Sequence, residues 1–590
     1  MKESLIRILE TPGLMEMIDQ QTRELLQEND IISNVQQTKD WRRILEENDD
    51  EEVTILPIDP FIDDAEMRNG MGSAAGSQKL TGVYLSLPFL PQHMANKNAC
   101  IIVLALFYAK LLELFGTRAV YSRIISDFND LIKDGLVIKT NSGIRRIRFR
   151  VTKALGDNLA LNQLFGYPCT FSSPGDFLRY CRTCLAPIKL CKVMCSPDEN
   201  LSRTVENYNE LARKPRAVSG LREISAFNDI HGFHVAKNKW QDLMHDLNGG
   251  VIPYTIGNIL TALIFEFNCF KLTDLNAAID KFNFGNEQNK PRHLISEYSK
   301  KKDNGTGPKK KIKVKQSASE ALCLARYLGL IIGHRVPVAN EHWHLYLIMR
   351  QIIDILTAPS YTRPDLANLR DLIREHNSRY FKLYGFLKPK MHFLLHYVEL
   401  LLLNGPLINS WSMPFERKNK ELRSIATNTS SSINLPWTIA FRVQIDFCGI
   451  QNQISQLMPT MKLGAVSNTV DRELRRFENL RHISSNAQVL KSVTLYNKEY
   501  TPGSVLLIRV NDEEGPVFGQ VHKIYLSNGR VYFLFKKIIT FYFYAHYHAY
   551  EVEVTDTLSD FINVQLLPSL VQCCLIREGD KEYVATRYRI

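Results

Sequence analysis

The sequence lacks any uninterrupted apolar run long enough to cross a membrane. The nearest candidate, residues 394–403, is interrupted by His396 and Glu399. The opening Met-Lys-Glu-Ser-Leu-Ile-Arg also lacks the apolar core of a secretory signal peptide. We therefore expect no membrane partner, and we expect the 11 cysteines to be reduced thiols, metal ligands or both.

A Cys/His zinc finger is also absent from residues 1–52, whose partial helical periodicity predicts a charged helical segment. The chain otherwise has the composition of a globular protein. Its 590 residues, of which 45% are hydrophobic and 23% charged, are enough for several domains. The formal net charge of +11 suits a polyanionic partner.

A strand pattern begins after the N-terminal segment. The expected elements are strands at residues 53–62, 80–87, 100–106 and 147–151, and a helix at 117–134 that stops at Gly135. Three strands, a helix and a fourth strand form the opening order of the RNase H-like fold. In that fold the crossover helix returns the fourth strand parallel to the first.

Aspartates follow the first and fourth of these strands. Asp63 and Asp64 end the first strand, and Asp157 comes shortly after the fourth. The carboxyl ends of the two parallel strands would lie side by side, so an aspartate from each could share a metal. Phosphoryl transfer uses two hard divalent ions about 4 Å apart, which take carboxylate ligands. Each aspartate alone is equally typical of a turn. We prefer Asp63 because it directly follows the apolar strand residues.

The stretch Lys388–Arg423 is the most distinctive part of the chain. His392 and His396 are four residues apart, which places both rings on one face of a helix in an arrangement that a metal can use. Glu416 follows among basic residues in Phe-Glu-Arg-Lys-Asn-Lys. Alternatively, the two histidine rings face an apolar core, and Glu416 is an ordinary surface charge paired with Lys420 at i+4.

These residues carry a resemblance to a known family. Lys-Pro-Lys-Met-His-Phe-Leu-Leu-His-Tyr, followed by Gly-Pro-Leu, Trp, Met and Phe-Glu, resembles the C-terminal part of the catalytic core of CACTA-type DNA transposases. That family is a branch of the RNase H-like, acid-triad transposases. The resemblance implies that Asp63, Asp157 and Glu416 are catalytic acids that hold Mg²⁺ or Mn²⁺. Gly-Asp-Asn at 156–158 also fits the family pattern, whereas Asn-Gly-Met-Gly at 69–72 departs from the usual Asn-Pro-Leu-Gly.

A structural zinc site is expected beside the last acid. Cys181 and Cys184 have the C-x-x-C spacing of half a zinc site, and His392 and His396 can supply the other half. This arrangement is similar to the one in the V(D)J recombinase and its transposon relatives. The alternatives are a local all-cysteine site, completed by the cysteines at 191 and 195, or no zinc at all.

Residues 190–390 are expected to form a mostly helical insertion between the second and third acids. Within it, Asp242 and His245 match an Asp-x-x-His signature found in several transposase branches, although a helix-capping Asp with a buried His fits equally well. Asp246 competes with Asp157 for the second metal position and is kept in reserve. A basic loop is expected to contact DNA phosphates or to act as a nuclear import signal through Lys309, Lys310, Lys311, Lys313 and Lys315.

The remaining boundaries follow from composition. We expect a first core part at 53–189, a zinc-linked helix and final core helix at 391–460, a linker at 461–495 and a small SH3-like β-barrel at 496–590. Asn528-Gly529 between two strand patterns predicts a tight hairpin. The fold class is therefore α/β, with an interrupted RNase H-like core and an all-β C-terminal domain.

The function predicted from these features is that of a DNA transposase-like polynucleotidyl transferase. It would cleave DNA at transposon ends and join the 3′-hydroxyl to target DNA. Its expected partners are double-stranded DNA and further copies of itself, with no small-molecule substrate, and its expected location is the nucleus. The alternative is a catalytically silent, transposase-derived protein that binds DNA or chromatin.

Overall fold

The computed structural model has a mixed α/β fold with two compact units. Unit 1 combines Met1–Val251 with Leu356–Met458, and unit 2 combines Ile252–Ile355 with Pro459–Ile590. The structure describes residues 1–27, 30–48, 50, 52–67, 79–169, 179–214, 219–285, 287, 289–298, 310–429, 433–467, 483, 487–511 and 515–589.

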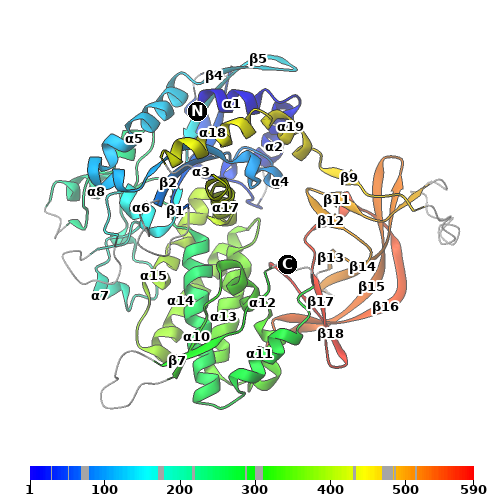
Figure 1. Ribbon diagram of the computed structural model, residues 1–590. Coiled ribbons are helices and arrows are strands. Elements are labelled where there is room, and N and C mark those ends of the chain that lie inside the picture. The colour runs from blue at the N-terminus through cyan, green and yellow to red at the C-terminus, as the bar shows by residue number, and fades with distance from the viewer. Residues whose placement is uncertain are drawn as a thin grey trace. The chain divides into compact units, whose positions relative to one another are not determined.

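Unit 1 is built around a curled mixed sheet (Figure 1). Its strand order is β3-β2-β1-β5-β4, and a short strand, β6, also pairs with β1. The strands are β1 (Val53–Glu66), β2 (Lys79–Ser86), β3 (Ile102–Tyr108), β4 (Leu136–Thr140), β5 (Gly143–Val151) and β6 (Leu155–Gly156). The pairs β1/β2 and β2/β3 are antiparallel, whereas β5 and β6 both run parallel to β1.

The crossover between these two parts of the sheet is α5 (Lys110–Lys133). It buries Ile124, Phe128 and Leu131, and the chain leaves the helix at Gly135, whose φ of +68° favours glycine. The expected order of three strands, a helix and a parallel return is therefore present. Sequence analysis missed β4. This strand has only five residues, and it is stabilised by pairing with β5 across a tight turn at 141–142, which composition does not reveal.

The N-terminal segment is helical, as expected, and belongs to unit 1. It contains α1 (Lys2–Leu9), α2 (Leu14–Leu26) and α3 (Lys39–Glu46). Leu5, Ile8 and Leu9 form the buried face of α1, which lies against β4 and α19 (Ile450–Leu457).

Further helices complete unit 1. They are α6 (Asn158–Leu164), α7 (Ile188–Cys191), α8 (Val205–Ala212), the π-helix η5 (Met244–Val251), α14 (Arg363–Tyr384), α15 (Pro389–Leu394), α16 (Tyr397–Asn404), α17 (Met413–Thr427) and α18 (Leu435–Phe447). The face of α17 that meets β1 is aromatic. Phe415 stacks on Phe61 with a centroid separation of 3.9 Å and an interplanar angle of 2°.

Unit 2 contains the rest of the helical insertion. Its helices are α10 (Ile252–Phe265), α11 (Leu272–Lys281), α12 (Ala318–Ile332) and α13 (Glu341–Leu356). The helical stretch Met244–Phe265 is long and apolar enough to cross a membrane, but 72% of its most apolar window is buried inside the protein. A helix in a protein core meets the same test, so this stretch is weak evidence for a membrane.

The expected basic loop is instead part of a β-hairpin, which corrects that expectation. β8 (Lys310–Lys313) pairs with β7 (Ile295–Tyr298) and lies against α10. Ile312 is the buried residue that anchors β8, so alternation leaves Lys311 and Lys313 exposed. Lys309 lies outside the described residues.

The C-terminal strands, yellow to red in Figure 1, form antiparallel sheets. The larger has the order β10-β14-β15-β16-β18-β17, with β13 also beside β14, and the smaller has the order β12-β11-β9. The strands are β9 (Met461–Leu463), β10 (Gln488–Leu490), β11 (Val493–Leu495), β12 (Lys498–Tyr500), β13 (Val505–Asn511), β14 (Gly515–Ser527), β15 (Arg530–Tyr544), β16 (Ala549–Asn563), β17 (Cys574–Glu578) and β18 (Lys581–Ala585).

Two expectations for this region have different outcomes. The hairpin at Asn528-Gly529 is confirmed: it joins β14 to β15, and both residues have positive φ, 51° and 74°. The linker expected at 461–495 instead contains β9, β10 and β11. Short strands of this kind are stabilised by pairing with distant strands, which composition does not reveal.

Candidate functional site

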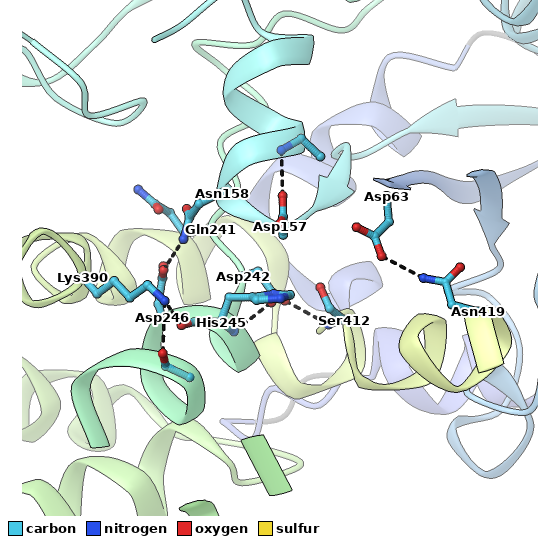
Figure 2. A network of polar contacts seen from close by, with 12 residues as sticks. Asp63, Asp157, Asn158, Gln241, Asp242, His245, Asp246, Lys390, Ser412 and Asn419 are labelled. Atoms are coloured by element: carbon cyan, nitrogen blue, oxygen red, sulfur yellow. Dashed lines mark hydrogen bonds and ion pairs between the residues drawn. The ribbon is translucent and has the colours of Figure 1, made fainter. Parts of the chain in front are cut away.

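Two of the predicted acids lie beside one another at neighbouring parallel strands. Ile62 of β1 pairs with Gly156 of β6, so Asp63 is the next residue of β1 and Asp157 directly follows the end of β6. A Cβ at Gly156 would lie 2.6 Å from the carbonyl oxygen of Ile62, which explains why a glycine allows the strands to approach here. Figure 2 shows both carboxylates where β6 ends; the expected end of the first strand at Asp63 is not observed, because pairing with β2 continues β1 to Glu66.

The third acid is brought to the same place by α17. Glu416 directly follows Phe415, which stacks on β1, and Asn419 one turn later donates a hydrogen bond from Nδ2 to Oδ2 of Asp63 at 2.8 Å. Sequence analysis missed Asn419, although its i,i+3 spacing from Glu416 places both on one helix face.

The electrostatics of Asp63 show how the acids act on one another. Burial, then the negative charges of Glu416 and Asp157, raise the pKa of Asp63 to about 8. Three segments far apart in the sequence therefore place carboxyl groups within electrostatic range of one another. Such a grouping favours either a bound proton or a bound cation.

Asp64 lies in a different environment from Asp63. It accepts a hydrogen bond from Oγ1 of Thr81 at 2.5 Å and forms an ion pair with Lys79 at 2.9 Å. Successive strand residues point to opposite faces, so Asp63 is the one that meets α17. The geometry thus favours Asp63 over Asp64.

Asp157 also has a local structural role. Its Oδ1 accepts a hydrogen bond from the backbone N–H of Ala160 at 2.6 Å and caps α6. The sequence equally fits Asp157 as an ordinary residue of a turn after a strand. One of its oxygens does have such a local role, because it caps α6. Among the described residues, none donates a hydrogen bond to Oδ2 of Asp157, so this oxygen can take another ligand.

Asp242 and His245 form a hydrogen-bonded pair near these acids (Figure 2). Oδ2 of Asp242 lies 2.6 Å from Nδ1 of His245 and 3.0 Å from its backbone nitrogen. Burial alone would lower the pKa of His245, but the hydrogen bond and charge of Asp242, together with the charge of Asp157, raise it to about 9. The capping half of the alternative is observed, because Asp242 accepts from the backbone N–H of His245; the histidine itself is only half-buried.

Asp246, the reserve for the second metal position, is fully buried and occupied. Its Oδ1 accepts from Nδ2 of Asn158 at 2.5 Å, and its Oδ2 accepts from the hydroxyl of Tyr397 at 3.0 Å. Burial raises its pKa to about 6, against the opposing effect of Lys390. With both oxygens in use, Asp246 fits a structural role better than a metal-binding role.

A buried cluster in the same unit has the composition of a zinc site. Cys181, Cys184, His392 and His396 offer ligand atoms that all lie within 4.8 Å of one another. Sγ of Cys181 lies 3.4 Å from Nε2 of His396, and Sγ of Cys184 lies 3.3 Å from Nε2 of His392. Ligand bonds of about 2.3 Å and 2.1 Å in a tetrahedron separate S and N by about 3.6 Å, so these gaps suit zinc.

The chemistry of the cluster also suits a metal. Burial opposes ionisation of Cys181, but Cys184 and the two histidines hold the pKa of its thiol well below the usual range. A thiolate is the form that binds a metal. The cluster can therefore hold a structural zinc that ties the loop before α7 to the helices before Glu416.

The local all-cysteine alternative is less well supported. Sγ of Cys191 lies 3.5 Å from the carbonyl oxygen of Ala186, and Sγ of Cys195 lies 3.4 Å from that of Val193. Neither cysteine belongs to the cluster. Among the described residues, no second group of three or more His, Cys, Asp or Glu residues gathers as a metal site would, so no catalytic metal site is evident.

The predicted DNA-contacting lysines belong to unit 2. Lys310, Lys311 and Lys313 lie on β8, and Lys315 follows the strand and pairs with Glu297. Lys310 lies over the ring of Tyr298 at 5.5 Å. The exposed side of β8 is therefore basic, as a phosphate-contacting surface would be.

A scan against protein-family models and a search of curated proteins found no match to this chain.

Proposed function

We propose that this protein is a DNA transposase-like polynucleotidyl transferase with Asp63, Asp157 and Glu416 as its acid triad. The observation that carries the proposal is the convergence of these acids, which raises the pKa of Asp63 to about 8. A site of this charge is costly unless a proton or a cation offsets it. Carboxylates are the ligands that hard divalent ions take, which supports a cation at this site.

The chemistry follows from the carboxylates. Asp63, Asp157 and Glu416 would hold Mg²⁺ or Mn²⁺, and these ions would neutralise charge on the attacking and leaving oxygens of a phosphodiester. Asn419 would keep Asp63 oriented through their 2.8 Å hydrogen bond. The aromatic contact between Phe61 and Phe415 would fix the distance between β1 and the helix that bears Glu416.

The finer classification of the fold belongs to the same proposal. An antiparallel β1-β2-β3 meander, a helical crossover and strands parallel to β1 support an RNase H-like core. For residues 496–590 we propose an SH3-like barrel. Its support is the antiparallel run β13 to β16 around a core that includes Leu506, Val521, Phe533 and Phe535.

The proposed partners are double-stranded DNA and further copies of this chain, and the proposed location is the nucleus. The exposed lysines of β8 and the net charge of +11 support a polyanionic partner.

The second candidate function is that of a catalytically silent DNA- or chromatin-binding protein. The observation that favours it is that the described acids are not gathered at metal-ligand separations.

Metal-dependent strand cleavage tests the proposal. Purified protein is incubated with Mn²⁺ and DNA that carries the terminal repeats flanking its gene. We expect cleavage by the parent and none by Glu416→Gln or Asp157→Asn, because each removes a charge from the triad. Asp246→Asn is the matched control, since Asp246 is the alternative to Asp157 for the second metal position; the folded variant should retain cleavage. Equal DNA binding without cleavage in parent and variants would favour the silent protein.

A further inference from the structure

A cavity of about 200 Å³ in unit 1 is separate from the sites described above. Its wall is formed by α3, by residues 150–152 where β5 ends, by residues 237–239 and by residues 403–404 at the end of α16. None of the three predicted acids and none of the zinc-cluster residues belongs to this wall. Water occupies about 30 Å³ a molecule, so the cavity has room for roughly seven waters or one small solvated ion.

The wall of this cavity carries more positive than negative charge. Its basic residues are Arg43, Arg150, Lys237 and Lys239, and its acidic residues are Asp40 and Glu47. Arg43 forms an ion pair with each acid, at 3.0 and 3.7 Å, and Lys239 pairs with Glu399 at 2.7 Å. Arg150 and Lys237 form no ion pair with any residue that the structure describes. Two positive charges of the wall are therefore left without a counter-ion from the described protein.

Arg150 is half-buried, and its charge is desolvated without being paired. Its Nη1 donates to the carbonyl oxygens of Ile132 and Phe149, at 3.3 and 3.0 Å, and no described residue accepts from its other nitrogens. Burial, then the charge of Arg148, lowers the pKa of Arg150, and the charge of Glu47 opposes this effect. An anion that enters the cavity would stabilise the guanidinium, because it supplies the missing opposite charge.

Two further donors of the wall lack acceptors within the described chain. Lys237 is exposed, and no described residue accepts from its Nζ. Trp41 is 1% exposed, and its buried Nε1–H has no hydrogen-bond partner there either. Buried donors of this kind are uncommon, because they lose their hydrogen bonds to water on folding. An oxygen of a small anion in the cavity is the kind of acceptor that these donors require.

The chemistry of the donors favours phosphate among small anions. A guanidinium presents a planar set of N–H groups that matches phosphate oxygens, and a lysine adds a point charge. The two unpaired cations match a phosphomonoester, which carries about two negative charges at pH 7. A phosphate within a DNA strand carries one charge and is flanked by two sugars, so it suits a cavity of this size less well.

We propose that this cavity binds a dianionic phosphate group, held by Arg150 and Lys237 and accepting from the indole N–H of Trp41. The group can be free in solution, as inorganic phosphate or a small phosphomonoester, or it can be the 5′-phosphate at the end of a DNA strand. The site needs neither a metal nor the acid triad. It is therefore independent of whether the protein cleaves DNA.

Calorimetric titration of inorganic phosphate into the full-length protein in EDTA tests the site. We expect Arg150→Gln and Lys237→Gln each to weaken phosphate binding at least about tenfold, the usual loss for a charge-assisted hydrogen bond. Trp41→Phe keeps an aromatic ring but removes the N–H, and it should weaken binding about threefold. Lys133→Gln, at an exposed lysine of α5 outside the wall, should bind phosphate as the parent does.

A variant of opposite sign separates a direct contact from a structural role. Glu47→Gln removes a negative charge from the wall, so phosphate binding should tighten about threefold, whereas a disturbed fold would weaken it. Lys237→Gln changes an exposed side chain and should unfold at the parental temperature, so its loss of binding would not reflect a loss of fold. No binding to the parent at about 10 mM phosphate, or parental binding in both Arg150→Gln and Lys237→Gln, would overturn the proposal.

Two DNA duplexes distinguish the sources of the phosphate. They share one sequence, one with 5′-phosphates and one with 5′-hydroxyls, and their binding is followed by fluorescence anisotropy. A preference for the phosphorylated duplex that is lost in Lys237→Gln and on adding inorganic phosphate would assign the site to a strand terminus. Equal binding of both duplexes by a parent that binds inorganic phosphate would assign it to a free phosphate or phosphomonoester. Either result retains the site, and neither depends on DNA cleavage.

Discussion

Replacing Asp63 with asparagine should stabilise the metal-free protein. The folded state raises the pKa of this carboxyl from 3.8 to about 8. Between these values the unfolded chain releases the proton while the folded protein retains it, so the free energy of unfolding falls as pH rises. At about 1.36 kcal/mol per pKa unit, the full effect is roughly 5–6 kcal/mol. Asparagine removes the effect and can still accept the hydrogen bond from Asn419.

The sign and size of this effect can be measured by urea denaturation in EDTA. The stability difference between Asp63→Asn and the parent should grow by roughly 4 kcal/mol between pH 5 and pH 8. Over most of this range the folded parent binds a proton at Asp63 that its unfolded chain releases, so the parent loses stability as pH rises. Below about pH 4 the contribution of Asp63 vanishes, since both states are protonated. Asp64→Asn, which loses its ion pair with Lys79, should show no such growth.

Manganese should narrow the difference in stability between Asp63→Asn and the parent. A ligand that binds only the folded protein stabilises it by mass action, and the parent has the carboxylate that the ion needs. We expect Mn²⁺ at pH 8 to raise the unfolding temperature of the parent more than that of Asp63→Asn. A stability difference in EDTA that does not change with pH would refute the electrostatic reasoning about the acid cluster.

Three further predictions concern other parts of the molecule. Cys181→Ser should lose bound zinc, measured by elemental analysis, and should unfold at a lower temperature, whereas Cys195→Ser should keep both properties. Gly156→Ala should cost about 1–3 kcal/mol of stability in denaturation, since its Cβ would lie 2.6 Å from a β1 carbonyl oxygen; parental stability would contradict this packing. The double variant Lys311→Ala and Lys313→Ala should weaken binding to all DNA sequences equally and reduce the salt slope by about 2, measured by fluorescence anisotropy. An unchanged slope would exclude β8 from the interface.

The sequence by itself determined the local elements of this protein. Gly135 stops a helix and Asn528-Gly529 makes a tight turn because backbone conformation at those positions depends on the residues themselves. The order of the first strands and their crossover also followed, since the handedness of such a connection is almost fixed. Asp63, Asp157 and Glu416 were singled out by motif and by their positions at element ends.

Only the tertiary structure decided which residues meet. Strand alternation separates Asp63 from Asp64, but the face that α17 covers is set by packing of Phe415 on the sheet. The sequence marked the four residues of the zinc cluster through their C-x-x-C and i,i+4 spacings. Their two halves are more than 200 residues apart, so whether they meet depends on how the helices assemble. The same holds for β4, β8 and β9 to β11, because a short strand exists only where a partner supplies its hydrogen bonds.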